Sequence, residues 1–166
     1  MTHICIIDAN VSQPYHVGSV FERPLGGTEA AACYLSHALA QLGHQITFIS
    51  HHPSVLQQYA GIQSLSLEER LDYIQTTRPD IVIEVARPAF GDDEDIHLAG
   101  VKRYLWVHLP HNHPMMRIFS FPSTIQKFDA IVFVGEWQCQ QYIQYFALPV
   151  HKCVVIPNGI SSHFQS

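Results

Sequence analysis

Short runs of apolar residues, each bounded by turn-forming residues, recur along the whole chain. Such runs are typical of buried strands when Gly, Pro, Asn or Asp flank them. The run from Phe128 to Val134 is almost entirely apolar, as in a parallel sheet that is buried on both faces. The pattern predicts six strands, at residues 4–8, 46–50, 80–85, 101–107, 128–134 and 153–156.

Between these strands, three segments carry the apolar spacing of helices. Gly26 and Gly27 open the first, and Gly43 follows its last apolar residue, as glycine often does at a helix C-terminus. Ser66 and Glu69 open the second as a capping-box pair. Helices that alternate with strands predict an α/β fold: a Rossmann-like parallel sheet with helices on both faces. The predicted helices cover residues 26–42, 66–77 and 136–146.

The organisation of the chain points to one domain. Its 166 residues suit a single α/β domain, and no linker interrupts them. The loop from Val11 to Leu25 is long for a compact domain, and loops of that length are usually functional. We expect residues 1–160 to form one Rossmann-like domain, and residues 161–166 to begin a hinge or a C-terminal tail.

Composition and charge exclude several classes of protein. Hydrophobic residues make up 47% and charged residues 14%, the balance of a filled core rather than of a disordered chain. A net charge of −5 without a basic run argues against binding of nucleic acid. The sequence shows no signal peptide and no apolar stretch long enough to cross a bilayer, so we expect a cytoplasmic protein without a transmembrane segment. The cysteines form no CxxC pair and are interpreted as buried thiols in a reducing compartment: Cys5, Cys33, Cys139 and Cys153.

The first candidate site is the start of the helix at Gly26-Gly27-Thr28-Glu29. Ligands of a parallel sheet bind at the carboxyl ends of its strands, and the free N–H groups of a helix N-terminus favour an anion. The spacing is not that of a dinucleotide-binding GxGxxG motif. An alternative is that Gly26 and Gly27 only form a tight turn, with Thr28 as the N-cap.

The second candidate is the loop from Trp106 to Pro114, directly after a strand. Its three histidines, His108, His111 and His113, do not have the spacing of a zinc site, so we expect no metal. A polar substrate-binding loop that includes Asn112 fits better, with imidazoles donating to or accepting from hydroxyls. An alternative is that only one histidine faces a ligand.

A third strand-to-helix junction lies at residues 134–138. Glu136 is a candidate substrate contact there, or it simply complements the helix dipole. The acidic run at residues 92–95 is interpreted as a solvated face. The sequence contains no GxSxG motif and no P-loop, so no specific feature supports a hydrolase.

The order of these motifs resembles that of family 4 glycosyltransferases. A strand, a long loop and Gly-Gly-Thr-Glu opening a helix come first, and four further segments follow in the family's order over nearly the whole chain. These segments are Tyr104-Leu105-Trp106-Val107-His108, the strand at 128–134, Glu136-Trp137-Gln138 and Val155-Ile156-Pro157-Asn158-Gly159-Ile160.

The resemblance implies one half of a GT-B fold, in which two Rossmann-like domains face each other across a cleft. The N-terminal half mainly binds the acceptor, and the C-terminal half binds the nucleotide sugar. By the same resemblance, Gly26 and Gly27 approach the donor phosphates, His108 contacts the reacting sugar or acceptor with His111 as second choice, and residues 157–159 lead into the second domain. The family normally retains anomeric configuration and needs neither metal nor cofactor.

The sequence also departs from the family. It stops at Ser166 without the donor-binding half, and it contains few cationic groups for a nucleotide diphosphate. Gly135 stands where the family often has a serine. We therefore expect an acceptor-binding domain that is inactive alone and transfers a sugar to a hydroxyl with a donor-binding half. The alternative is a non-catalytic binding module with the same fold, and an exposed apolar patch at the carboxyl edge of the sheet would favour a missing partner domain.

Overall fold

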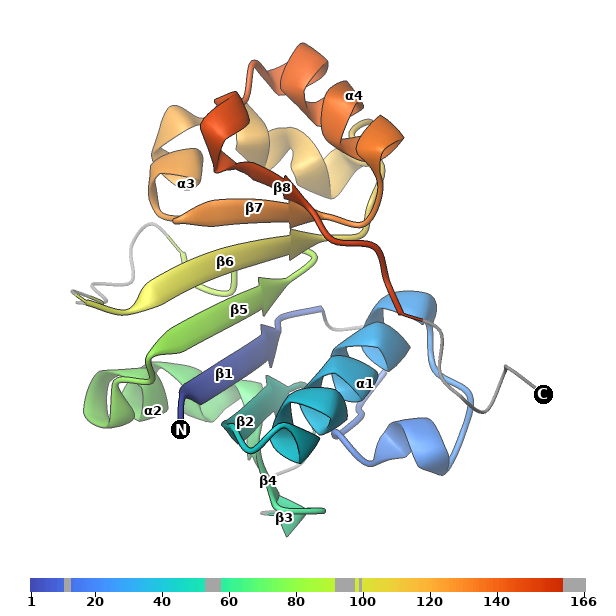
Figure 1. The fold of residues 1–166 in the computed structure, drawn as a ribbon, viewed down its shortest axis with the longest axis vertical. Helices are drawn as coiled ribbons and strands as arrows, with labels where there is room; N and C mark the ends of the chain where they lie inside the picture. Colours follow the sequence, from blue (N-terminus) through green and yellow to red (C-terminus); the bar gives the residue numbers. More distant parts are fainter. Residues whose placement is uncertain (11–12, 53–57, 92–97, 99, 160–166) are drawn as a thin grey trace.

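The computed structural model describes residues 1–10, 13–52, 58–91, 98 and 100–159, and one sheet runs through them (Figure 1). Its strand order is β3-β4-β2-β1-β5-β6-β7-β8, and all neighbours pair parallel except β3 and β4. The α/β fold is confirmed. The strands are β1 (His3–Asp8), β2 (Gln45–Ser50), β3 (Gln58–Tyr59), β4 (Ile62–Ser66), β5 (Ile81–Val85), β6 (Lys102–Val107), β7 (Ala130–Phe133) and β8 (Cys153–Val155).

The helices follow the strands in the expected alternation. The capping box of Ser66 and Glu69 is present, but the segment behind it begins as a 3-10 turn before becoming α-helical. Gly43 has a φ of 87°, which fits its predicted place behind a helix C-terminus. The helices are α1 (Gly27–Gln41), α2 (Arg70–Thr77), α3 (Pro122–Gln126) and α4 (Glu136–Phe146), with the 3-10 turns η1 (Ser19–Phe21), η2 (Leu67–Glu69), η3 (Pro114–Ser120) and η4 (Val150–Lys152).

Two parts of the fold were not predicted. The β3–β4 hairpin turns at Ala60 and Gly61, both with positive φ, and its second strand is short and alternating rather than continuously apolar. The region after the loop at 106–114 forms η3 and α3, for which the sequence analysis predicted no element.

Two cores lie on one face of the sheet, opposite to α1. One packs Ile74 of α2 against β1, β2 and β5, and the other packs Tyr142 of α4, with η3 and α3, against β6 and β7. On the other face, α1 packs over β1 and β2 with Ala32 and Cys33. Because α2, α3 and α4 all lie on the first face, α1 is the one α-helix of the described residues that covers the second.

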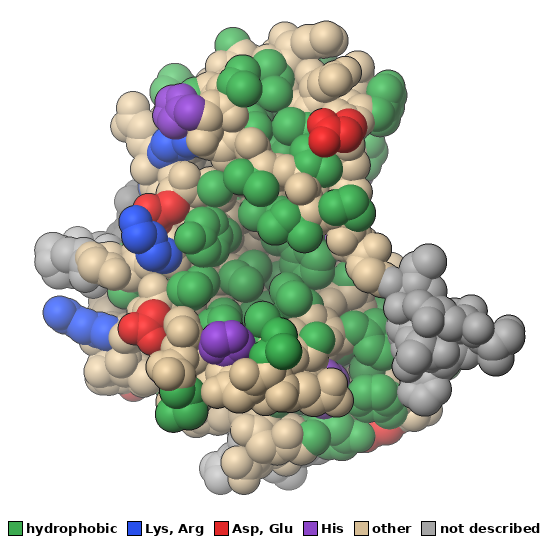
Figure 2. Space-filling view, viewed as in Figure 1, with side chains coloured by type: hydrophobic (Ala, Val, Ile, Leu, Met, Phe, Trp, Pro, Cys, Tyr) green, Lys and Arg blue, Asp and Glu red, His purple; other side chains and the backbone are tan. Residues whose placement is uncertain are grey.

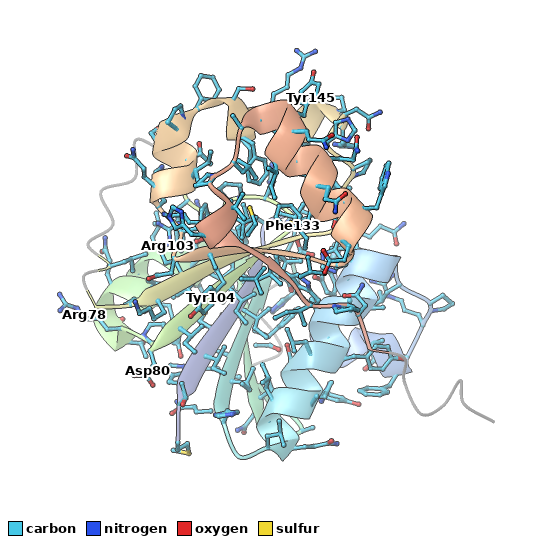
Figure 3. The ribbon with its side chains drawn as sticks, turned by 45° about the horizontal axis from the view of Figure 1, so that its top comes forward. Arg78, Asp80, Arg103, Tyr104, Phe133 and Tyr145 are labelled. Carbon is cyan, nitrogen blue, oxygen red and sulfur yellow. The ribbon has the colours of Figure 1, made fainter. Side chains whose placement is uncertain are left out.

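Helices therefore lie on both faces of the sheet, as predicted, with α1 on one face and α2, α3 and α4 on the other. Next to α1, strands β5 to β8 leave an apolar groove of about 790 Å³, visible as a hollow of hydrophobic side chains in Figure 2. Successive residues of a strand point to opposite faces, so Tyr104 of β6 lines this groove while Arg103 lies on the other side (Figure 3). The uncovered apolar surface lies on a sheet face rather than at the carboxyl edge. Its lining includes Ile83, Tyr104, Trp106, Val132, Val154 and Ile156.

A buried ion pair joins β5 to β6. The Arg103 guanidinium donates two hydrogen bonds to Glu84 Oε1, at 2.9 and 2.6 Å, and the other carboxylate oxygen accepts the Ala89 backbone N–H at 2.7 Å. The guanidinium also lies over the rings of Phe90 and Phe128, at 5.4 and 4.9 Å from their centres. This pair fixes the start of the segment that follows β5.

The four cysteines are free thiols, as expected, and three of them are buried. Burial raises the pKa of Cys5 and raises that of Cys33 to about 12, so both remain protonated and unreactive near neutral pH. Among the described residues, no helix has both the length and the apolar character that a membrane span requires.

Candidate functional site

The N-terminus of α1 is open at Gly27. Gly26 is the N-cap, with extended backbone, and Gly27 is the first helical residue. Neither glycine has a positive φ, so the backbone conformation does not require glycine at either position. A Cβ built on Gly27 meets no atom of the described residues within 4 Å. The lack of a side chain leaves free space in front of the helix rather than relieving a clash inside the fold.

At Gly26 the nearest group is the carboxylate of Glu29, which bends back from the third helical position towards the N-cap. A Cβ at Gly26 would displace this flexible carboxylate rather than the backbone. Thr28 is the second residue of the helix and partly buried. The alternative in which Thr28 caps the helix is therefore wrong, because Gly26 occupies the capping position and no side chain caps it.

His108 lies directly behind β6, at the carboxyl edge of the sheet. Its ring packs against Trp106, with 4.4 Å between ring centres. Burial lowers the pKa of His108, and the Trp106 backbone, Asn158 and the Glu29 carboxylate oppose that shift only in part. The ring is therefore neutral near pH 7, with one nitrogen able to donate and the other able to accept. Within the described residues, neither ring nitrogen has a hydrogen bond of good geometry.

These contacts bring some of the predicted site residues together. The Glu29 carboxylate, in the first turn of α1, acts electrostatically on the His108 ring, so the ring and the opening of α1 belong to one site. Asn158, in the segment that leaves β8, also acts on the ring. The sequence identified that segment only as an exit towards a second domain, so its contact with His108 was missed.

The other predicted residues lie elsewhere at the same edge. His111 packs against Tyr145 of α4, with 5.2 Å between ring centres (Tyr145 is labelled in Figure 3). Asn112 and Glu136 are exposed, and Glu136 is the first residue of α4. His113 has a structural role, since its Nδ1 accepts the Met115 N–H and so caps η3.

Asp8, which sequence reasoning treated only as the end of a strand, holds the long loop in place. Its buried carboxylate accepts the Tyr15 hydroxyl at 2.5 Å and the Asn10 N–H at 2.9 Å. The Tyr15 backbone in turn accepts a hydrogen bond from Ser50 Oγ at 2.6 Å. Burial raises the pKa of Asp8, with the tyrosine hydroxyl opposing the shift. One feature of the sequence could have indicated this role: Asp8 is an ionisable residue at the carboxyl end of a buried strand.

The sequence matches the family model of glycosyltransferase family 4 over residues 25–164, most of the chain. The chain belongs to glycosyltransferase family 4. The matched range includes the opening of α1, the loop after β6 and the segment at 157–159. A comparison with curated proteins finds no match.

Solved structures confirm the fold of this family 4 domain. A glycosyltransferase from Rickettsia africae ESF-5 superposes with a TM-score of 0.62 at 16% identity, over 96% of this chain and 44% of that one. An α-glucosyltransferase solved with UDP and a 13-mer DNA gives 0.54 at 10% identity, over 97% of this chain and 42% of that one. The family 4 domain thus spans less than half of either protein. The DNA is a ligand in the structure of that second protein only. Our expectation that this chain binds no nucleic acid stays a prediction.

Over the part of the chain that is described, no three His, Cys, Asp or Glu side chains are grouped so as to hold an ion. The chemistry available at the edge is a neutral imidazole, an open helix N-terminus and nearby amide and carboxylate groups.

Proposed function

We propose that this domain, residues 1–160, is the acceptor side of a glycosyltransferase that moves a sugar from a nucleotide sugar to a hydroxyl group. Family membership supports the transferase activity. The juxtaposition of the neutral His108 ring with the open N-terminus of α1 carries the proposal, because it joins a proton-handling group to an anion-favouring one. A donor-binding half, on the same or another polypeptide, completes the site.

In the proposed reaction, the acceptor oxygen forms a bond to the anomeric carbon of the sugar. The bond from that carbon to the donor phosphate oxygen breaks, and its electron pair leaves with the nucleoside diphosphate. The leaving phosphate takes up the proton that the acceptor hydroxyl loses, and configuration is retained. His108 accepts a hydrogen bond from a sugar or acceptor hydroxyl and holds it for the reaction. The free N–H groups at Gly27 stabilise the charge that develops on the leaving phosphate. Thr28, His111, Asn112 and Glu136 are proposed as further contacts to substrate.

Two observations support the need for a second half. The solved glycosyltransferases are more than twice as long as the region that they share with this chain. The groove beside α1 brings together apolar side chains from strands β5 to β8, which suits a surface against which further polypeptide packs. The free thiols fit the reducing cytoplasm, which we propose as the location.

Gly27→Ala separates this function from a structural role of the glycine. Because the new methyl group meets no atom of the described residues, we expect the free energy of unfolding to be unchanged or raised by up to about 1 kcal/mol. The same methyl group occupies the space in front of the helix, so sugar transfer by the assembled enzyme should fall about tenfold or more. Gly27→Val should lower transfer further.

Thermal unfolding and initial rates of transfer measure the two effects on the same variants. Full transfer activity in both variants would contradict the role of Gly27. An assembled enzyme that binds sugars but never transfers them would instead favour the non-catalytic binding module.

A further inference from the structure

A second cavity, of about 600 Å³, lies on the sheet face opposite to α1, among the helices α2 and α3 and the turn η3. Its walls include three segments that follow strands in the sequence. These are Ala9 after β1, residues 87–91 after β5, and the start of η3 after β6. These segments all follow the carboxyl ends of strands, where ligands of parallel sheets bind. We call it the basic cavity because of the side chains that line it.

Four of the nine Lys and Arg residues of this acidic chain line the basic cavity. They come from four separate segments and so are brought together only by the fold. No Asp or Glu is among the described residues that line it. Cations normally repel one another, and a cavity that gathers them selects for an anion. The four are Arg70, Arg87, Arg117 and Lys127.

Arg87 is held in place yet has an unused donor. The residue before it, Ala86, has a φ of 64°, a left-handed conformation that is unfavourable for alanine. This bend carries the guanidinium to the Ala9 carbonyl, to which Nη2 donates a hydrogen bond. The Nε atom is buried and has no hydrogen-bond partner in the described residues. A buried donor without a partner is costly, and an anion in the cavity would satisfy it.

The other cations differ in how they are positioned. Arg70 donates to the Ala89 carbonyl at 2.9 Å and to the Leu67 carbonyl at 3.1 Å, so its guanidinium is fixed beside the cavity without losing charge. Arg117 is exposed on η3, and Lys127 lies just behind α3 and partly buried.

The carboxylates that act on these cations lie outside the lining. Glu84 acts on Lys127, but it is fully buried and is held by Arg103. Asp8 acts on Arg87 and is held by Tyr15. Glu68 acts on Arg70 from the surface, where its side chain is exposed to water. These groups reduce the positive charge of the cavity without filling it.

Apolar side chains form the rest of the lining. Met115 and Ile118 of η3 contribute, and Phe121, at the end of η3, is 62% exposed. An inorganic anion needs no such surface, whereas a phosphate attached to an apolar body can contact both parts of the wall.

We propose that the basic cavity binds the phosphate group of a ligand, with the apolar side chains contacting the body that carries it. Several cations around one cavity suit the double negative charge of a phosphomonoester, and guanidinium groups bond its oxygens in pairs. If the domain is the acceptor side, as proposed above, phosphate binding in this cavity identifies the acceptor as a phosphorylated molecule. The binding itself does not depend on sugar transfer.

The test is titration of the purified chain with inorganic phosphate, by calorimetry and by phosphorus NMR. Arg117→Gln removes one cation that makes no described contact within the fold, and should weaken phosphate binding about tenfold. Arg78→Gln is the matched control, because Arg78 is also exposed but follows α2 in the chain and is not part of the cavity lining. The control should bind phosphate as the unchanged chain does.

A second arm identifies the source of the phosphate. Sedimentation with vesicles of phosphatidylcholine, with and without phosphatidic acid, shows whether a lipid headgroup is the ligand. Capture only by phosphatidic acid vesicles, lost in Arg117→Gln, assigns a lipid, and phosphate binding without vesicle capture assigns a soluble phosphate ester. Absence of both, or equal weakening by Arg117→Gln and Arg78→Gln, would overturn the proposal and leave the proposed transfer reaction untested by this result.

Discussion

Replacing His108 with alanine should lower the rate of sugar transfer by the assembled enzyme about a hundredfold or more, while the domain stays folded. The ring is kept neutral by burial, so its loss removes a group that both donates and accepts at pH 7. Its packing partner Trp106 is anchored in the core of the α1 face and holds the local structure without it. Transfer rates at saturating donor and acceptor, with thermal unfolding, measure both effects.

His113→Ala is the matched control in the same loop. This histidine caps η3, so its loss should cost about 1 kcal/mol of stability and leave transfer within about threefold of the unchanged enzyme. Full activity in His108→Ala, or unfolding of that variant, would refute the role of His108. A large loss in His111→Ala instead would move the role to the second histidine.

Glu84→Gln should destabilise the domain by about 3 kcal/mol or more, the largest effect on stability that we expect from one substitution. Glu84 is fully buried and Arg103 is 12% exposed, so the amide leaves a buried guanidinium without its counter-charge. Chemical denaturation with the free energy extrapolated to water measures the loss.

The matched control is the neighbouring pair on the surface. Lys102 lies 2.8 Å from Asp129 but is 62% exposed, so Lys102→Ala should cost less than about 1 kcal/mol. Equal losses in the two variants would show that burial does not determine the strength of these pairs here.

Local signals predicted much of the fold. The bounds of α4, the capping box at Ser66 and the glycine behind α1 all depend on residues within a few positions of one another. Such features can be recognised in the sequence without knowledge of the tertiary structure. The β3–β4 hairpin was missed because short alternating strands carry little apolar signal, and its pairing with β2 supplies what the local sequence does not.

Features that depend on distant residues could not be predicted. The sequence contains only nine Lys and Arg residues, which suggested few sites for binding an anion. The fold nevertheless brings four of these residues together around one cavity. The apolar groove on β5 to β8 depends on the face of the sheet to which α2, α3 and α4 pack, which no local pattern in the sequence indicates. Asp8 and Tyr15 meet because the long loop folds back on β1, and only the structure shows that contact.

The central claim is that this domain is the acceptor side and that the nucleotide sugar binds the other half. Calorimetric titration of the purified chain with common nucleotide sugars, beside inorganic phosphate, tests it most directly. We predict that no nucleotide sugar binds the isolated chain more tightly than phosphate does, and that tight binding and turnover begin when the donor-binding half is added. Tight binding of a nucleotide sugar by the isolated chain would contradict the account, because the donor site would then lie on this half.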